Sequence, residues 1–463
     1  MSRNGDSERR VNHAPTALAP VLLFAFLNSI GSAVAYSGLF SLAKFQYGFG
    51  RAENFLLALL FGVAYIPAAM LVGPMLRRLP EVGAGSPFLN HRGVLLGFMV
   101  AIGVLCWVPW IAMQLGSGRD TWPIWLLCAV YSAMSGMMWP IVESYVSGGR
   151  RAGELRRAIG RFNIAWSSAL VLTLLVIAPL VEERALLILR AVGVVQWLTA
   201  IVLVWFKARP GRHVHDPELP ATPTVQKDVS CPHCHCSLLG AMVAGSCPEC
   251  GKPVADAFSL AHPPVYARLL AAHQWLLPVA FLGISALAPY LTIAFERLKV
   301  PPVWETPLIA VWMIARVAAF GAMERWHGWH GRWTTPVVGT ALVLMSLALV
   351  ILVPVFVPGG GALGIGVLCA GLVGFGAGVG MVYAATLYYT MEVGSAELEA
   401  SGLFETLIGV GYVMGPLCGL VGSAAVRLGG APVATGEWLT VGMVAAISGI
   451  GVWAARRRAL KAT

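Results

Sequence analysis

Charged side chains are scarce in this chain. Asp, Glu, Lys and Arg together make up only 12% of its 463 residues, whereas hydrophobic residues make up 57% and the mean hydropathy is +0.74. So little polar surface cannot cover a soluble globule of this size. The composition therefore excludes a soluble protein and predicts an integral membrane protein.

Acidic residues are scarcer than basic ones, with 22 Asp and Glu against 32 Lys and Arg, so the formal net charge is +10. A basic balance can indicate nucleic-acid binding, but these basic residues stand in short clusters between apolar runs, as juxtamembrane charges do. We therefore expect a lipid bilayer as a partner and no nucleic acid.

Two kinds of functional motif are also missing. The chain has no Gly-x-x-x-x-Gly-Lys-Ser/Thr loop, so transport driven directly by ATP within this chain is not supported. It contains no convincing constellation of catalytic side chains either, and an enzyme is not expected.

Apolar runs long enough to cross a bilayer, about 20 residues each, recur along the whole chain. They fall at 17–42, 54–76, 93–115, 122–147, 160–181 and 186–206, and then at 268–294, 303–323, 333–357, 361–390, 400–426 and 436–456. The sequence thus predicts an all-α membrane protein with about twelve transmembrane helices.

The first run has an alternative interpretation. It follows a polar N-terminus that contains Arg3, Arg9 and Arg10, and it ends near small residues, so it could be a signal peptide. It is, however, longer than a typical signal-peptide h-region. We therefore expect a first transmembrane helix.

Loop charges predict the orientation. If the N-terminus is cytoplasmic, most basic residues lie inside, including the clusters at 150–161 and 456–461. The outside then keeps only eight: Lys44, Arg51, Arg119, Arg184, Arg190, Arg297, Lys299 and Arg427. The positive-inside rule favours this orientation, with both termini and the central loop in the cytoplasm of a cell whose inner membrane holds the protein.

The two halves resemble each other in sequence. The fourth span ends with Met138-Trp-Pro-Ile-Val-Glu-Ser-Tyr145 and is followed by Gly160-Arg-Phe-Asn163. The tenth ends with Met381-Val-Tyr-Ala-Ala-Thr-Leu-Tyr388 and is followed by Gly402-Leu-Phe-Glu405. This order and spacing indicate a duplicated six-helix unit, and hence two pseudo-symmetric bundles.

Two loops carry a related motif. Gly73-Pro-Met-Leu-Arg77 follows the second span, and Gly321-Ala-Met-Glu324-Arg325, with Arg332 after it, follows the eighth. Here the chain resembles the major facilitator superfamily, which has a Gly-x-x-x-Asp-Arg-x-Gly-Arg-Arg-like signature in both cytoplasmic loops. The resemblance implies a charge network that gates the cytoplasmic side. The first copy departs from the signature, with Leu76 in place of the acid. For Glu324 and Arg325 the alternative to a gate is that they are solvated loop charges.

The eleventh span contains Gly411-Tyr-Val-Met-Gly415-Pro416-Leu-Cys-Gly419, similar to a Gly-x-x-x-Gly-Pro-x-x-Gly pattern of the same family. Small residues at this spacing let helices approach closely, and the proline bends its helix. The fifth span lacks the corresponding glycines. Since that pattern is diagnostic of the family's drug/proton antiporters, its absence speaks against an antiporter.

Polar side chains inside the spans are costly, so they usually face a cavity or a partner. The candidates for substrate binding or coupling are Glu143, Asn163, Arg316 and Glu405. A desolvated carboxylate among them could bind and release protons. Each also has a structural explanation as a helix-to-helix contact, a backbone bridge or an interfacial group.

Aromatic residues crowd the spans, and rings with a polar tip suit sugars, nucleosides or amphipathic drugs. They are Tyr36, Tyr65, Tyr131, Trp139, Tyr145, Trp166, Trp312, Tyr383, Tyr388, Tyr389 and Tyr412. Most are expected to be packing or belt residues. Tyr145 and Tyr388 occupy matched repeat positions and are the preferred candidates.

The central interval holds the other strong motif. Cys231 and Cys234 form one Cys-x-x-Cys knuckle, and Cys247 and Cys250 form a second. Two such knuckles complete a tetrahedral thiolate site, which predicts structural Zn²⁺ in a zinc ribbon, with rubredoxin-like iron as the alternative. His233, His235 and Cys236 lie beside it as less probable ligands. Four protein ligands leave no open position for catalysis.

These observations divide the chain into a first bundle at 1–206, a cytoplasmic linker at 207–264 with the ribbon at 231–251, and a second bundle at 265–463. The resemblance implies a secondary transporter of a small molecule by alternating access, and proton coupling is open. The ribbon could dock a cytoplasmic protein. The alternative is a membrane sensor or scaffold that signals through the zinc module.

Overall fold

The structure is a computed structural model that describes residues 15–77, 90–117, 120–150, 152–211, 250–251, 264–357, 361–393, 398–430 and 432–461. All regular secondary structure in these ranges is helical. They contain 12 helical spans that are long and apolar enough to cross a membrane. The expected all-α class and the number of spans are thus confirmed.

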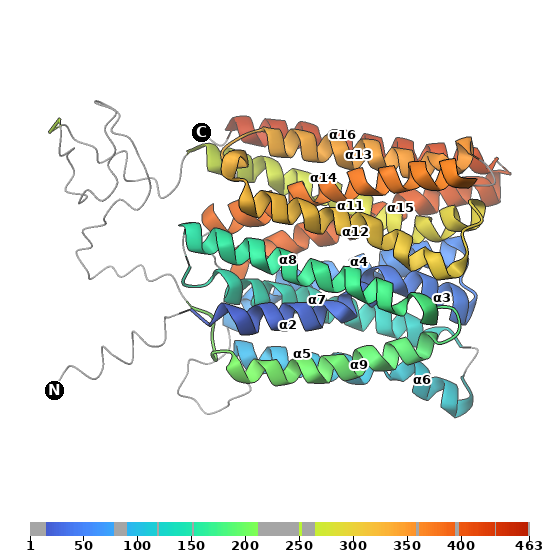
Figure 1. Ribbon diagram of the computed structural model, residues 1–463, viewed down its shortest axis with the longest axis horizontal. Helices are drawn as coiled ribbons and strands as arrows, with labels where there is room; N and C mark the ends of the chain where they lie inside the picture. The colour runs from blue at the N-terminus through green and yellow to red at the C-terminus, as the bar shows by residue number, and fades with distance from the viewer. Residues whose placement is uncertain are drawn as a thin grey trace.

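The first half supplies six of these spans (Figure 1). They are α2 (Leu18–Ala33) continued by the π-helical turn η1 (Val34–Gly38) and α3 (Leu39–Tyr47); α4 (Arg51–Arg77); α5 (His91–Leu105) with α6 (Val108–Ala112) and η2 (Met113–Ser117); α7 (Trp122–Ser147); α8 (Ala152–Ile177); and α9 (Ala185–Val202). The short 3₁₀ turns η3 (Ala178–Leu180) and η4 (Leu203–Trp205) follow α8 and α9.

The second half repeats the pattern with six long helices and the short turn η5 (His327–Trp329). They are α11 (Pro264–Arg297), α12 (Pro302–Arg325), α13 (Thr334–Phe356), α14 (Gly361–Val393), α15 (Leu398–Gly429) and α16 (Val433–Lys461). Several helices begin before the apolar run that predicted them. α8, for example, starts at Ala152 rather than 160, because its first two turns are polar and carry arginines.

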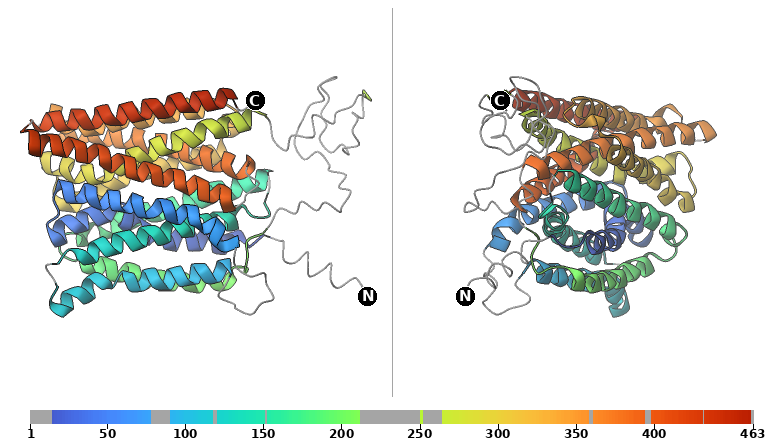
Figure 2. Two further views of the ribbon diagram at one scale, coloured as in Figure 1. Left: turned by 180° about the vertical axis from the view of Figure 1, so that it is seen from behind. Right: turned by 60° about the vertical axis from the view of Figure 1, so that its left-hand side comes forward.

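The halves lie side by side as two groups of helices, blue to green and yellow to red in Figures 1 and 2. Two extensive contacts join them, α4 with α15 and α8 with α12. In span order these are 2 with 11 and 5 with 8. Exchanging the halves turns one pair into the other, as a duplicated six-helix unit requires.

Small residues let these helices approach closely. A methyl group placed on Gly411 would lie 2.5 Å from Cβ of Phe281, and one on Gly419 would lie 2.2 Å from the Phe55 ring. The Ser285 hydroxyl donates to the Gly411 carbonyl at 2.8 Å. The glycine motif of α15 therefore seats this helix against α11 on one side and α4 on the other, with Pro416 inside the helix.

Gly415 offers a direct test of this packing. Gly415→Ala would place its methyl 2.1 Å from the Ser285 Oγ and 2.4 Å from the Leu282 carbonyl oxygen. We expect it to destabilise the protein by about 1–3 kcal/mol through overpacking, measured as thermal unfolding in detergent. Gly442→Ala in α16 is the matched control, since nothing lies within 4 Å of that position. Equal melting temperatures for the two variants would contradict close packing at Gly415.

The ends of the molecule are distinct. α2 begins and α16 ends at the same end of the bundle, which we call the proximal end (Figure 1). α9 ends and α11 begins there too. At the opposite, distal end α3 leads into α4, and α11 leads into α12.

Candidate functional site

A cavity of about 50 Å³ lies between the two halves. The first half lines it with Ser32, Tyr36, Ser37, Tyr65, Trp139, Trp166 and Leu170, and the second half with Phe281, Ile284, Trp312, Met313, Arg316, Tyr383, Glu405, Ile408 and Tyr412. Half of these side chains are aromatic. Two of the four polar residues singled out in the sequence, Arg316 and Glu405, thus reach one cavity.

Arg316 is the only arginine among the lining residues. Only 4% of it is exposed, and its Nε donates to the Ser167 hydroxyl at 3.1 Å. The guanidinium carbon lies 4.6 Å from the ring centroid of Trp166 and 4.8 Å from that of Trp312. Within the described residues Nη2 has no hydrogen bond and the guanidinium has no ion pair. Two cation–π contacts thus hold a charge that a ligand can still engage.

Asn163 does not line this cavity, but it orients a residue that does. The Trp166 Nε1 donates to the Asn163 side-chain oxygen at 3.1 Å, one helical turn away in α8. This fixes the indole ring over which the Arg316 guanidinium lies. Asn163 therefore acts through Trp166.

Glu405 faces the cavity from α15 and accepts a hydrogen bond from the Tyr65 hydroxyl at 2.5 Å. The neighbouring Tyr36 hydroxyl accepts from Trp139 Nε1 at 3.2 Å and lies 2.7 Å from the Ser135 hydroxyl. These bonds hold the polar tips of the rings in place. The cavity wall is therefore ordered before any ligand enters.

Glu143 lies behind this wall in α7 and is 2% exposed. Glu405 and Ser401 are close enough to influence the ionisation of its carboxyl group, yet neither of its oxygens makes a hydrogen bond of regular geometry. Two carboxyl groups, one from each half, thus adjoin in the interior. No basic side chain in the described residues forms an ion pair with either of them.

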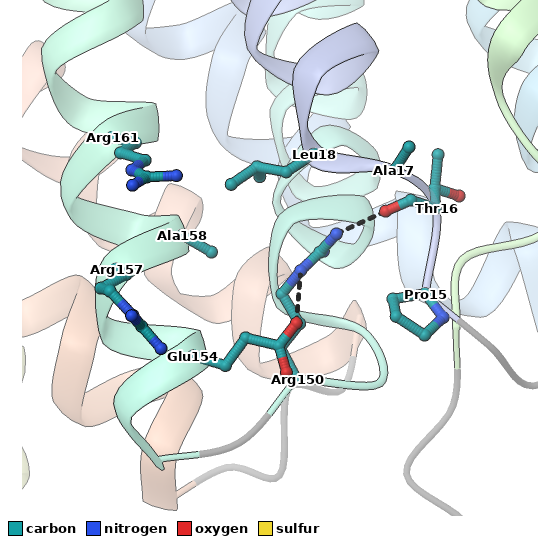
Figure 3. A pocket seen from close by; sticks show the side chains of 9 residues that line it. All are labelled: Pro15, Thr16, Ala17, Leu18, Arg150, Glu154, Arg157, Ala158 and Arg161. Carbon is teal, nitrogen blue, oxygen red and sulfur yellow. Dashed lines mark hydrogen bonds and ion pairs between the residues drawn. The ribbon is translucent and has the colours of Figure 1, made fainter.

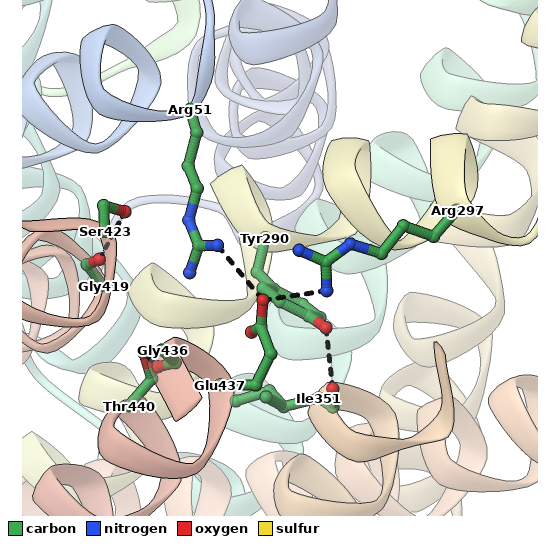
Figure 4. A network of polar contacts seen from close by, with 9 residues as sticks. All are labelled: Arg51, Tyr290, Arg297, Ile351, Gly419, Ser423, Gly436, Glu437 and Thr440. Carbon is green, nitrogen blue, oxygen red and sulfur yellow. Dashed lines mark hydrogen bonds and ion pairs between the residues drawn. The ribbon is translucent and has the colours of Figure 1, made fainter. Parts of the chain in front are cut away.

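Ion pairs close the distal end (Figure 4). The Glu437 Oε1 accepts from Arg51 at 3.1 Å and from Arg297 at 2.9 Å, and the Glu437 side chain is fully buried. Lys44 pairs with Glu305 at 3.4 Å. Arg51 and Lys44 belong to the first half and both glutamates to the second, so two of these three ion pairs join the halves.

The proximal end is closed by packing. A methyl on Gly160 in α8 would lie 2.5 Å from Cγ of Glu324 in α12, and one on Gly73 in α4 would lie 3.4 Å from Cγ of Glu399 in α15. The halves therefore meet at both ends of the cavity.

Of the charge network predicted at this end, the described residues show no ion pair. Arg325 and Arg332 are exposed, and among the residues described neither they nor Glu324 make an ion pair. A methyl group on Gly321 would have no neighbour within 4 Å. The structure describes the backbone of Arg77 but not its side chain. The gate stays a prediction.

Tyr145 and Tyr388 do not line the cavity. The Tyr145 hydroxyl donates to the Lys207 carbonyl at 2.7 Å, and its ring packs on Phe206. Tyr388 packs on Trp329 and His330. Their matched repeat positions place both rings near the proximal helix ends, because symmetry fixes the level of a residue along its helix and not the direction it faces.

The predicted metal ligands cannot be placed. Cys231, Cys234 and Cys247 lie outside the described residues, which include only Cys250 and Gly251 from the central interval. In the parts of the chain that are described, His, Cys, Asp and Glu form no cluster of three or more. The zinc site stays a prediction.

Comparison with known proteins gives one family and several similar structures. The sequence matches the Major Facilitator Superfamily over residues 21–416. The fold is similar to two crystal structures of the nucleoside transporter NupG. The structure of a point mutant has a TM-score of 0.60 and 12% identity, over 94% of this chain and 99% of its own. The other structure has a TM-score of 0.56 and 11% identity, over 95% of this chain and 98% of its own. The E. coli fucose:proton symporter FucP has a TM-score of 0.52 and 13% identity, over 95% of this chain and 98% of its own. No curated protein sequence matches. At these identities the likeness concerns the fold alone.

Proposed function

This chain belongs to the major facilitator superfamily and is a multi-pass membrane transporter, not an enzyme, and we propose that it is a secondary transporter that moves a small organic solute by alternating access. The observation that carries the proposal is the cavity between the halves, into which the buried Arg316 presents a charge without an acidic partner in the described structure. A buried charge is costly unless something binds it.

The cavity lining supports a solute that combines a flat face with hydroxyl groups. Tyrosine and tryptophan rings offer apolar faces, while Arg316 donates hydrogen bonds and Glu405 accepts them. Sugars and nucleosides have this combination. Two proteins of similar fold are described as a nucleoside transporter and a fucose:proton symporter, which is consistent with that class.

Glu143 and Glu405 support coupling to protons. Two adjoining buried carboxyl groups without a basic partner in the described structure are costly when both are charged. One of them therefore holds a proton while the site is closed. When the site has taken up this proton from one side of the membrane and then opens to water on the opposite side, the proton can leave.

Alternating access would use the contacts at the two ends. The distal ion pairs of Arg51 and Lys44 break when the cavity opens distally, and the packing of Glu324 on Gly160 breaks when it opens proximally. We assign the predicted charges at Arg325 and Arg332 to the proximal gate.

The charge distribution supports an inner-membrane protein whose proximal end faces the cytoplasm. The termini and the linker at 207–264 then lie inside, between bundles at 1–206 and 265–463. In this arrangement a zinc ribbon at 231–251 would be a cytoplasmic accessory and a docking site for a protein partner. The alternative of a sensor or scaffold, suggested by Leu76, has no finding in its favour.

Transport itself is the first test. Purified protein in proteoliposomes should take up at least one solute from a panel of hexoses, deoxyhexoses and nucleosides, and an imposed pH gradient should raise uptake. If correctly folded protein moves none of these with either gradient polarity, the proposed substrate class is rejected.

Arg316 should be essential for binding the transported solute. Arg316→Gln removes a charged donor facing the cavity, and such a hydrogen bond contributes about 1.5–3 kcal/mol, or roughly tenfold to 150-fold in affinity. The dissociation constant of the solute found in the panel would be measured by calorimetry. Arg427→Gln, at an exposed position near the end of α15, is the control. Equal affinity of the Arg316 variant and the control would remove Arg316 from the site.

The zinc proposal has its own measurement. Replacing Cys231 and Cys247 by Ser should release a single metal ion per chain, because each knuckle loses one of its two thiolates. Elemental analysis of purified protein detects zinc or iron directly. Cys369→Ser, within α14, should leave the metal content unchanged. Unaltered metal in the double variant would reject the ribbon.

A further inference from the structure

A second cavity, which shares no lining residue with the central one, lies at the proximal end where α8 begins (Figure 3). It has a volume of about 380 Å³ and lies between the start of α2 and the first three turns of α8. Three arginines line it, Arg150, Arg157 and Arg161, together with a single acid, Glu154. Its lining is therefore positive.

Arg150 builds the floor of this cavity. It is 3% exposed, and its guanidinium donates to the carbonyls of Tyr145 at 2.9 Å and Val146 at 2.8 Å, and to that of Thr16. Its Nε also pairs with Glu154 at 3.7 Å. Arg150 thus ties the end of α7 to the chain that enters α2, and it occupies the only acid of the cavity.

Arg157 and Arg161 are the two exposed arginines of the lining. They are one turn apart on the same face of α8, and in Figure 3 the Arg161 side chain extends toward Leu18 at the start of α2, whereas the Arg157 side chain extends on the side of Glu154. Arg161 makes no hydrogen bond or ion pair within the described residues. Two guanidinium groups at this spacing suit a phosphate, whose oxygens can accept from both.

The position of the cavity favours a lipid headgroup over a free ion. Thr16 and Ala17 line it, and α2 turns to the bilayer directly afterwards, with Leu23 46% exposed. On α8 the exposed apolar surface begins farther along, with Leu172 at 51%. The arginines therefore lie on the proximal side of the exposed apolar surface of both helices, toward the end of the bundle where lipid headgroups would lie.

We propose that this cavity binds the phosphate of an anionic phospholipid headgroup through Arg157 and Arg161. Inorganic phosphate shares the chemistry but not the acyl chains that would lie along the neighbouring apolar helix surface. The site is independent of the transported solute.

Native mass spectrometry of the full-length protein in dodecyl maltoside tests this site. Phosphatidylglycerol is titrated against phosphatidylcholine, which carries a phosphate but no net charge. We expect preferential retention of phosphatidylglycerol, and about thirtyfold weaker retention by the Arg157→Ala/Arg161→Ala variant, since each arginine near an anionic lipid contributes roughly fivefold. Arg456→Ala/Arg458→Ala removes two exposed charges from the end of α16 and should retain the lipid as the wild type does.

Three results would overturn the proposal. One is equal loss in both double variants, which would indicate a general charge effect. Another is displacement of phosphatidylglycerol by millimolar inorganic phosphate, which would assign the cavity to the free ion. The third is unchanged retention of phosphatidylglycerol by the Arg157→Ala/Arg161→Ala variant. If that double variant does not fold, the single variant Arg161→Glu takes its place in this test.

Discussion

Glu405→Gln is expected to abolish accumulation driven by a pH gradient while leaving exchange of solute across the membrane. Gln keeps the size of the side chain and its place beside Tyr65, but it cannot release a proton. A transporter that moves one proton per solute accumulates it about tenfold per pH unit, because each unit stores 1.36 kcal/mol. This ratio should fall to unity in the variant. Uptake and counterflow in proteoliposomes measure the two activities separately.

Glu143→Gln should show the same loss, because in the proposed coupling the proton is shared between the adjoining carboxyl groups of α7 and α15. Glu182→Gln, an exposed acid just before α9, is the control and should accumulate normally. Wild-type accumulation ratios in both the Glu143 and Glu405 variants would eliminate the proton site. Loss of exchange as well as accumulation would instead indicate that the charge of Glu405 is needed to bind the solute, and not for coupling alone.

The fold was predictable because the bilayer restricts the choices. A chain without water must satisfy its backbone within helices, and the bilayer thickness sets their length, so apolar runs alone give the number of spans. Helix ends escape this argument. The first turns of α8, from Ala152 to Ile159, carry arginines, so hydropathy does not register them, although they are helical and bury Leu155, Ala158 and Ile159 in the core.

The candidate site was predictable only in part. Arg316 and Glu405 stand out as charged residues within apolar runs, and the structure brings both to one cavity. The repeat, however, matches Glu405 with Asn163, whereas its neighbour in space is Glu143. Contacts across the interface between the halves join positions that the internal symmetry does not relate. They depend on how helices rotate and pack, which one sequence does not reveal.

The distal ion pairs were missed for a similar reason. Charge counting treats Arg51 and Arg297 as loop residues outside the membrane, and Glu437 reads as an acid in the first turns of a helix, a favourable position in itself. Glu437 lies 386 residues from Arg51. An acid at the start of one span and a base at the end of another on the same side of the membrane is the one signal that could have suggested the pairing.

Glu437→Gln is expected to open the distal end. The Glu437 carboxylate is fully buried and serves two arginines, whose side chains are only 17% and 25% exposed. Removing the acid leaves these charges without a partner in the closed form, at a cost of about 3–5 kcal/mol, whereas water can hydrate them in the open form. The population should therefore shift toward the distally open state by at least about a hundredfold. A membrane-impermeant maleimide that reacts with Ser37→Cys, in the cavity wall, reports this opening.

The two arginines should differ in effect, because only one of them joins the halves. Arg51 belongs to α4 in the first half, whereas Arg297 and Glu437 both belong to the second. Arg51→Gln breaks the contact between the halves and should raise the rate of labelling at Ser37→Cys. Arg297→Gln leaves Arg51 paired with Glu437 and should raise it far less. If the two arginine variants label equally fast, Glu437 stabilises the second bundle rather than the closed state, and the distal ion pairs do not gate the cavity.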